Sequence, residues 1–305
     1  MTVVGRFAPS PSGDMHAGNI FASLMAWLIA KGQGGRMVLR IEDLDRARSK
    51  QHFANKIMRD YEKLGLYWDD GPYYQSDTQR YDTFYDALES LGLTYPCFCT
   101  RADLHAAAAP HAGEQFVYPG TCRALTPEER RARMEEEAKT RYAIRLATPD
   151  APVSFSDAIC GDMCFNVGSD CGDFVVRRTD GSYAYQLAVV VDDALEGVNS
   201  VVRGNDLLSS TPQQIYLQQL LGFSTPSYAH VPLFVDTSGR RLSKRNRDAE
   251  IDELIAQWGS PRAVIGAIAH KAGLISHYEP LTPEELLTRD DLSLYDVGVH
   301  PIVWA

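Results

Sequence analysis

One short stretch, residues 6–19, constrains the fold of this chain more than any other. It reads R-F-A-P-S-P-S-G-D-M-H-A-G-N and joins the apolar run 3–7 to a second apolar run, 20–29. The prolines between the two runs interrupt regular backbone hydrogen bonding, because proline has a fixed φ and no backbone N–H. The stretch therefore predicts a short buried strand, a loop and an apolar helix, in that order.

The beginning of the predicted helix has the features of a phosphate site. A helix N-terminus presents unpaired N–H groups and a partial positive charge. Gly18 has no side chain, so a flat base or a phosphate is able to approach the backbone there. His16 supplies a donor for phosphate oxygens, and Asn19 follows in the motif H-A-G-N. Taken alone, the pattern equally fits a strand–helix junction with a chance histidine.

A second motif lies far downstream. Residues 240–245 read R-R-L-S-K-R and follow a strand-like run, 233–235, and a turn, 236–239. Together with H-x-G-N, this motif resembles the two signatures of class I aminoacyl-tRNA synthetases. The prefix A-P-S-P-S-G narrows the resemblance to the glutamyl group, and the match extends over nearly the whole chain.

The pattern of elements, read with this resemblance, predicts an α/β fold. We expect a Rossmann-like, parallel-sheet nucleotide-binding domain split by a zinc-bearing insertion, with a small helical C-terminal region. Its parts are the first half of the catalytic domain (1–94), the insertion (95–180), the second half with the second signature loop (181–245) and the helical region (246–305). We expect strands at 37–41, 187–191 and 198–202, a turn at 69–72, and helices at 51–64, 80–91, 211–221 and 251–258.

Composition is compatible with a cytoplasmic enzyme. The chain has 305 residues, 45% of them apolar, which is enough for a large core. No run reaches the ~18 apolar residues of a membrane span, and no signal peptide is visible, so we expect a cytoplasmic protein. The net charge of −10 is unfavourable for nucleic-acid binding unless basic residues cluster locally. The candidates for such a patch are Arg177, Arg178, Arg240, Arg241, Lys244, Arg245 and Arg247.

The resemblance implies a ligase reaction in two steps. A glutamate carboxylate attacks the α-phosphate of ATP, with Mg²⁺ accompanying the nucleotide, and a hydroxyl then attacks the acyl-adenylate. His16 and Lys244 are the implied catalytic residues, and Lys244 would meet the charge that develops on pyrophosphate. The implied ATP-binding residues are His16, Gly18, Asn19 and Lys244. The first lysine of the family's second signature is Arg241 here, and arginine does not replace lysine equivalently.

A glutamate pocket requires two cations and one anion. Arg6, Arg203 and Glu42 fit this requirement, and arginine is suited to carboxylates because its fork binds them in pairs. The sequence leaves open which arginine takes which carboxylate, and whether one of them pairs with Asp43 or Asp206 instead. The residues that the resemblance implies for glutamate are Arg6, Phe7, Ala8, Pro9, Ser10, Glu42, Tyr185 and Arg203.

Three cysteines and a tyrosine resemble a zinc knuckle. Structural zinc takes four ligands and thiolates suit it, and Cys97, Cys99 and Cys122, with Tyr118 four residues before the last, make up that number. His105 or His111 could replace Tyr118, and three free thiols are the alternative without metal. The remaining cysteines match no zinc spacing, and we interpret them as core thiols; they are Cys160, Cys164 and Cys171.

The resemblance is greatest to one branch of the glutamyl group. About 60 residues follow Arg245, whereas full-length glutamyl-tRNA synthetases continue with a large helical anticodon-binding region. The chain therefore most resembles the glutamyl-queuosine tRNA(Asp) synthetases, a family of catalytic-domain paralogues that glutamylate queuosine in the anticodon of tRNA(Asp). The expected partners are ATP, L-glutamate and tRNA(Asp) bearing queuosine. Two alternatives stay open, a shortened synthetase that charges a tRNA 3′ end and a non-catalytic paralogue that senses glutamate or binds RNA.

Overall fold

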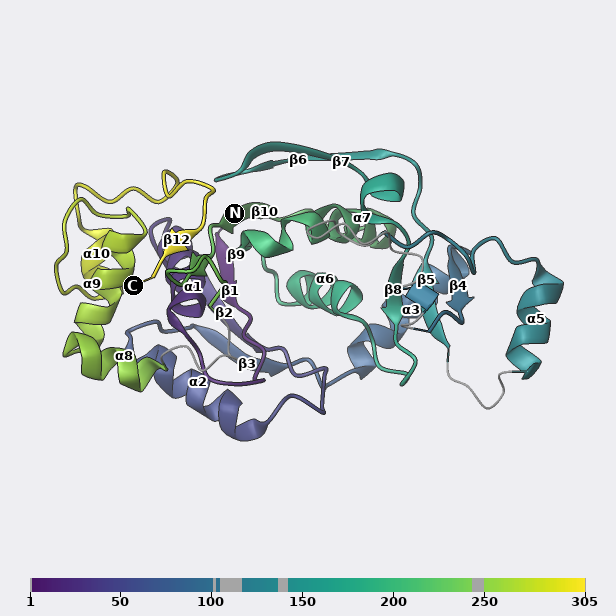
Figure 1. Ribbon diagram of the computed structural model, residues 1–305, viewed down its shortest axis with the longest axis horizontal. Coiled ribbons are helices and arrows are strands. Elements are labelled where there is room, and N and C mark those ends of the chain that lie inside the picture. Colours follow the sequence, from purple (N-terminus) through teal and green to yellow (C-terminus); the bar gives the residue numbers. More distant parts are fainter. Residues whose placement is uncertain (1, 101–102, 105–116, 137–141, 243–249, 305) are drawn as a thin grey trace.

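The computed structural model describes residues 2–100, 103–104, 117–136, 142–242 and 250–304. Two sets of parallel strands lie at its centre (Figure 1). The first set has the order β1 (Val4–Phe7), β2 (Arg36–Ile41), β3 (Asp70–Tyr74). In the second, β9 (Ser200–Gly204) pairs in parallel with β10 (Ser227–Val231). The two sets meet where the backbone N–H of Asn199 donates to the carbonyl of Val4 at 3.0 Å, so β1 lies against β9.

Helices cover this sheet because their apolar residues need burial. Helix α1 (Ala17–Lys31) contacts β1, β2 and β9, and most of its residues are buried in the largest apolar cluster. Helix α2 (Gln51–Lys63) follows β2 and adds one apolar face to the same cluster. A second apolar cluster joins three further helices, α3 (Gln79–Ser90), α6 (Tyr185–Leu195) and α7 (Thr211–Leu221).

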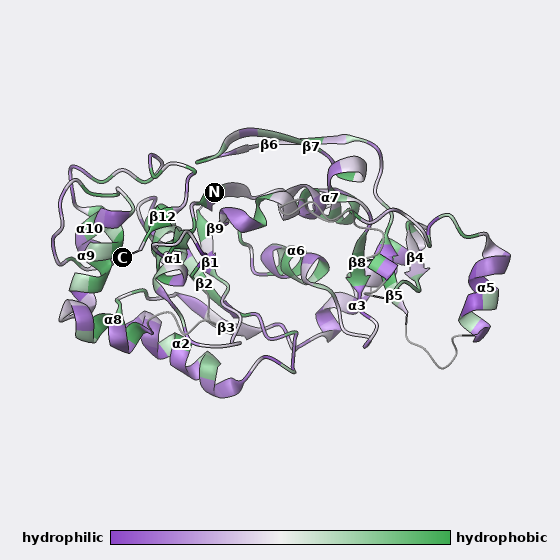
Figure 2. Cartoon of the chain, in the orientation of Figure 1, coloured by the Kyte–Doolittle hydropathy of each residue, from purple (hydrophilic) through white to green (hydrophobic). Residues whose placement is uncertain are grey.

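The segment between the two halves forms a third sheet and a hairpin. Strands β4 (Thr94–Cys97), β5 (Ala143–Leu146) and β8 (Phe174–Arg177) are antiparallel. The hairpin β6 (Pro152–Asp157) and β7 (Gly161–Asn166) continues the central strands, since β6 pairs with β10. Helix α5 (Pro127–Glu136) has no buried residue and is mostly hydrophilic (Figure 2). The short π-helix η1 (Val167–Cys171) completes this part, and the 3₁₀ helix η2 (Asn205–Ser210) follows β9.

The C-terminal elements lie at the end of the molecule opposite α5 (Figure 1). They are α8 (Ile251–Trp258), α9 (Pro261–Lys271), α10 (Pro283–Leu287) and β12 (Ile302–Val303). Strand β12 pairs in parallel with β11 (Phe234–Val235), which leads into the second signature. Thr126 and Thr282 each form a capping box, because the hydroxyl accepts from the backbone N–H of the glutamate three residues later and that glutamate accepts from the threonine N–H. None of the described helices is both long and apolar enough to cross a membrane.

The prediction of a strand at 187–191 is wrong, because these residues belong to helix α6. A run of five apolar residues does not distinguish a strand from a buried helix. The run is continuous because α6 is enclosed by α3, α7 and β8, so residues on all its sides are buried. The helix has a consequence for the site, since its last turns carry Asp192 and Asp193 and its C-cap is Glu196, and all three carboxylates form ion pairs with Arg40 of β2.

The prediction of a turn at 69–72 is also wrong, because Asp70–Tyr74 is strand β3. Proline argues against a strand because it cannot donate to the ladder. Here Pro72 is tolerated because β3 is the outer strand of its set, and its pairing with β2 shifts register between Val38 and Arg40. The other predicted strands and helices are confirmed within one or two residues.

Candidate active site

A cleft of about 1100 Å³ opens at the carboxyl ends of the central strands. This is where open α/β sheets bind their ligands. All the described residues that the sequence implies for glutamate and ATP line it, namely Arg6, Phe7, Ala8, Pro9, Ser10, His16, Gly18, Asn19, Glu42, Tyr185 and Arg203. Lys244 lies outside the described residues, as do His105 and His111.

The first signature forms the entry to helix α1. His16 precedes the helix, and its backbone N–H donates to Oδ1 of Asn19 at 3.2 Å. A Cβ at Gly18 would lie 3.2 Å from two ring atoms of His16, closer than ordinary contacts. Gly18 therefore leaves room for the imidazole as well as for a ligand, and both line the cleft.

Arg6 points from the end of β1 toward the end of β9. Its Nη1 donates to the carbonyl of Val202 at 2.8 Å, and its Nε lies 3.7 Å from Oδ1 of Asp193. Burial lowers the pKa of Arg6, and the charges of Arg40 and Arg203 act in the same direction against Asp193. An arginine nevertheless stays protonated, so this part of the cleft has a positive charge that favours an anionic ligand.

Arg203 has a different environment from Arg6. Its side chain is 6% exposed, and all its partners among the described residues are neutral. Its Nε donates to His230, Nη1 to Gln214 and Nη2 to Thr211, at 3.0, 2.8 and 2.8 Å. Within this part of the chain no carboxylate forms an ion pair with Arg203. Burying a charge without a counterion is costly, so Arg203 is prepared for a negatively charged ligand.

Glu42 is the anion at the end of β2. Glu42 forms an ion pair with Arg40, whose Nη2 lies 3.5 Å from Oε1 of Glu42. Burial raises the pKa of Glu42, against the effect of Arg40 and Arg6. A bound ammonium would favour its ionised form, because an adjacent opposite charge lowers a carboxyl pKa.

A buried ionic cluster lies under the cleft, and the sequence did not predict it. Arg40 is fully buried, and its Nη1 is 2.8 Å from Asp193 and 2.7 Å from Glu196. Arg80 reaches the same cluster through Asp192 at 3.1 Å. The signal that could have predicted this cluster was Arg40 inside the apolar strand 37–41, because a charged residue is almost never fully buried unless it pairs with opposite charges.

Neither Arg6 nor Arg203 pairs with Asp43 or Asp206, the two alternatives that the sequence left open. Asp206 instead pairs with Arg241, with 2.6 Å between Oδ2 and Nη1. Asp43 accepts from the backbone N–H of Ser76. Arg241 therefore connects the beginning of the second signature to the turn after β9, and both Arg241 and Asp206 line the cleft.

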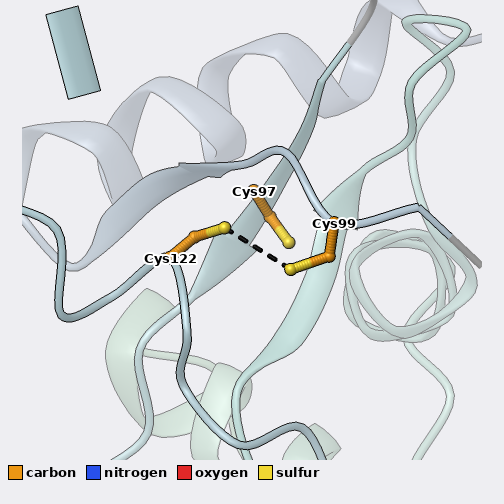
Figure 3. A group of neighbouring side chains, drawn as sticks. All are labelled: Cys97, Cys99 and Cys122. Atoms are coloured by element: carbon orange, nitrogen blue, oxygen red, sulfur yellow. Dashed lines mark hydrogen bonds between the residues drawn. The ribbon is translucent and has the colours of Figure 1, made fainter. Parts of the chain in front are cut away.

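Three cysteine sulfurs converge about the third sheet (Figure 3). The Sγ atoms of Cys97, Cys99 and Cys122 lie within 4.8 Å of one another. The hydroxyl of Tyr118 is 3.6 Å from the sulfurs of Cys97 and Cys99. Tetrahedral zinc with bonds of about 2.3 Å would hold its sulfurs about 3.8 Å apart, so the donor set fits this metal.

Arg145 adds a positive charge to this cluster. Its Nε donates to the sulfur of Cys97 at 3.2 Å, and its guanidinium lies 3.8 Å from the ring centroid of Tyr118. Burial opposes ionisation of Cys97, but the hydrogen bonds from Arg145 and Tyr118 prevail, so the pKa of this thiol is lowered. All six cysteines are free thiols. The interpretation of Cys160, Cys164 and Cys171 as core thiols holds for Cys171 alone, because Cys160 is half-buried and Cys164 is exposed.

Comparison with known proteins identifies the class that this fold and cleft define. The model of the tRNA synthetases class I (E and Q), catalytic domain, matches residues 2–297. The chain belongs to this family of class I tRNA synthetases. Its fold is similar to the glutamate-tRNA synthetase from Elizabethkingia anophelis, with a TM-score of 0.83 and 27% identity, over 100% of this chain and 68% of that one.

Within the family, the chain is similar to proteins named glutamyl-Q tRNA(Asp) synthetase. The protein of Symbiobacterium thermophilum is 49% identical over 303 residues, which are 95% of this chain and 92% of the relative. That of Nitratidesulfovibrio vulgaris is 47% identical over 311 residues, or 98% of this chain and 94% of the relative. The resemblance that the two signatures predicted is therefore confirmed.

Proposed function

We propose that this chain activates L-glutamate with ATP and transfers the glutamyl group to queuosine in the anticodon of tRNA(Asp). Relatives at 47–49% identity are named glutamyl-Q tRNA(Asp) synthetase, which supports this substrate. The observation that carries the proposal is the cleft itself, in which two buried arginines and Glu42 lie beside the first signature.

Each charged group of glutamate has a counterpart in the cleft. Arg203 receives one carboxylate, because its buried guanidinium has only neutral partners among the described residues. Arg6 attracts the other carboxylate, although Asp193 already offsets part of its charge. Glu42 accepts the ammonium, and Ser10 and Tyr185 complete the pocket. Phe7, Ala8 and Pro9 form the wall between the amino acid and the nucleotide.

The first signature serves the nucleotide. His16 and the N–H groups at the beginning of α1 hold phosphate oxygens. Gly18 leaves space for the nucleotide, and Asn19 lines that space.

The reaction has two steps. In the first, the glutamate carboxylate attacks the α-phosphate, a new P–O bond forms, and the bond to pyrophosphate breaks. Lys244 then stabilises the leaving charge. Mg²⁺, bound with ATP, neutralises part of the phosphate charge. In the second step a queuosine hydroxyl attacks the acyl carbon, and AMP leaves.

The cysteine cluster has a structural role in this proposal. Cys97, Cys99, Tyr118 and Cys122 hold one zinc ion, which ties the beginning of the insertion to β4. Arg145 offsets the negative charge of the thiolates around the ion.

The test compares two forms of one tRNA. Purified protein is incubated with ATP, labelled glutamate and tRNA(Asp) that either contains queuosine or carries guanine at that position. We expect label on the queuosine form alone, and the label should resist removal of the 3′-terminal adenosine. Label on both forms that is lost with the 3′ end would indicate a synthetase that charges the acceptor. Absence of glutamate-dependent ATP–pyrophosphate exchange would indicate a non-catalytic paralogue.

A further inference from the structure

We propose that Asp157 and His230 are positioning residues that hold Arg203 in its orientation and keep its charge available for the substrate carboxylate. This inference rests on the proposed function, in which Arg203 binds glutamate. Neither residue lines the cleft, and the sequence alone did not single them out. They join three neighbouring strands, because Asp157 ends β6, His230 lies in β10 and Arg203 lies in β9.

The ring of His230 is fully buried between the other two side chains. Its Nδ1 lies 2.6 Å from Oδ2 of Asp157, and its Nε2 lies 3.0 Å from Nε of Arg203. A guanidinium donates and never accepts, so Nε2 must be the nitrogen without a proton. The imidazole is therefore neutral and carries its proton on Nδ1, which donates to Asp157.

The second carboxylate oxygen of Asp157, Oδ1, is held by backbone hydrogen bonds. Its Oδ1 accepts from the backbone N–H groups of Ile159, Cys160 and His230, at 3.0, 2.9 and 3.1 Å. Only Oδ2 is left for the ring, so the carboxylate determines which nitrogen of His230 bears the proton. The role resembles that of the carboxylate in a catalytic triad, which maintains one tautomer of its histidine.

This arrangement keeps Arg203 charged toward the cleft. A carboxylate placed directly against Arg203 would neutralise its charge and reduce its attraction for glutamate. A neutral imidazole accepts the Nε hydrogen without neutralising the guanidinium, and Gln214 and Thr211 do the same at the other nitrogens. Burial lowers the pKa of His230, and the charge of Arg203 adds to this effect against Asp157. Both influences favour the neutral ring.

The sharpest test is Asp157→Asn, which preserves shape and reverses the tautomer. The three backbone N–H groups retain the amide oxygen at the Oδ1 position, so the new NH₂ faces Nδ1 of His230. The ring must then accept at Nδ1 and carry its proton on Nε2, opposite the N–H of Arg203. We expect the Michaelis constant for glutamate to rise about 10- to 100-fold, by analogy with the loss of a residue that orients a metal ligand. The Michaelis constant for ATP should stay nearly unchanged.

Two substitutions of His230 separate its contact with Asp157, at Nδ1, from its contacts at Nε2, where Arg203 donates and the hydroxyl of Thr211 lies 3.2 Å away. His230→Asn places an amide near the Nδ1 position and retains a partner for Asp157, but it offers Arg203 no acceptor. His230→Gln extends an amide oxygen toward the Nε2 position and retains that acceptor. We expect the glutamine variant to bind glutamate at least several-fold better than the asparagine variant. A purely structural role for His230 would not produce this order.

Tyr228→Phe is the matched control on the same strand. Tyr228 is 3% exposed, and its hydroxyl accepts from Gln218 rather than from Arg203. The variant therefore loses a buried hydrogen bond but keeps the ring, whose centroid lies 5.6 Å from Cζ of Arg203 and 6.0 Å from the ring of His230. Thermal unfolding is measured for all variants, and glutamate-dependent ATP–pyrophosphate exchange should give a wild-type Michaelis constant for Tyr228→Phe alone.

Nitrogen NMR of protein labelled in histidine tests the tautomer independently of catalysis. We expect a protonated Nδ1 in the wild type and a protonated Nε2 in Asp157→Asn. A protonated Nε2 in the wild type overturns the inference. An unchanged Michaelis constant for glutamate in a folded Asp157→Asn protein also overturns it while leaving the proposed function intact. Wild-type protein that does not activate glutamate refutes the proposed function instead, and with it the role given to Arg203.

Discussion

Nε of Arg6 lies 3.7 Å from Oδ1 of Asp193, whereas no described carboxylate forms an ion pair with Arg203. Asp193 is shared, because the same oxygen is 2.8 Å from Nη1 of Arg40. The two arginines of the cleft therefore differ in how much of their charge remains for a ligand. Arg203 retains more of it, and this difference leads to a prediction about amino-acid selectivity.

We predict that Arg203→Ala abolishes most of the preference for glutamate over glutamine. Glutamine has a neutral amide and leaves a buried guanidinium without a counterion, at a cost of about 3–5 kcal/mol. Exchange of ATP with pyrophosphate is measured with glutamate, glutamine and aspartate for the wild type and the variant. Lys63→Ala is the control, because this cation lies on α2 outside the cleft. If the wild type activates glutamine comparably, the pocket with two arginines is rejected.

We predict that Lys244→Ala slows adenylate formation strongly and leaves glutamate binding nearly intact. The charge that Lys244 meets exists only as pyrophosphate leaves, so its loss affects the rate rather than ground-state binding. Removing one such stabilising donor typically costs about 2.7–4 kcal/mol. Single-turnover measurement of adenylate formation tests this prediction, and a wild-type rate in the variant would contradict the role assigned to Lys244.

We predict one zinc ion per chain, lost in Cys122→Ser. Cys122 is buried, and its sulfur is 3.5 Å from that of Cys99, so serine would remove one of three thiolate ligands. Cys164→Ser is the matched control, because Cys164 is exposed and lies outside the cluster. Metal analysis measures the zinc content. Removal of the metal by a chelator should also increase hydrogen exchange in β4 and its neighbours. Equal zinc content in both variants would show that the ligand set is wrong.

We predict that the Michaelis constant for glutamate rises as the pH falls below about 6.5, the pKa of histidine in an unfolded chain. Burial lowers the pKa of His230 in the folded protein. The ring is therefore neutral above pH 6.5, and it becomes protonated as the pH falls through the pKa that His230 has in the folded protein. The protonated ring would direct a donor at Arg203. Folding stability should decrease over the same range, because the unfolded chain then binds more protons.

The groups that face His230 do not change charge in this range. Burial opposes ionisation of Asp157, but its hydrogen bonds prevail and lower its pKa. Burial raises the pKa of Cys160 to about 11, and Arg203 and Arg6 stay protonated. Glu196, whose pKa burial raises to about 7, lies against Arg40 and titrates in every variant. The Michaelis constant for glutamate is therefore measured from pH 5 to 8 for the wild type and for His230→Gln. An identical pH dependence in both proteins would exclude His230 as its source.

Local sequence determined the elements around the first signature. The prolines and Gly13 between two apolar runs require a loop, and the runs have lengths that suit one short strand and one helix. Thr126 and Thr282 likewise specify their helix beginnings through hydrogen bonds that span only three residues. Such features depend on neighbours in the chain, so they can be predicted without knowledge of the fold.

The run 187–191 shows where local sequence was insufficient. Strand and helix bury five consecutive apolar residues equally well, and only the packing of α6 against α3 and α7 decides between them. The choice matters for the site, because the helix brings Asp193 to Arg6 and Arg40. A strand would alternate its side chains between two faces, so adjacent Asp192 and Asp193 would not both reach Arg40.

The sequence by itself indicated which residues could hold glutamate and ATP. Arg6, His16 and Gly18 lie in the first signature, whereas Glu42, Tyr185 and Arg203 followed from the charges that a glutamate pocket requires and from the family resemblance. It did not determine how Arg203 is held. Asp157, His230 and Arg203 are separated by 73 and 27 residues, and their contacts arise only when β6, β10 and β9 lie side by side. The protonation of a buried ring depends on the atoms that surround it in space, so this part of the site was decided by the tertiary structure alone.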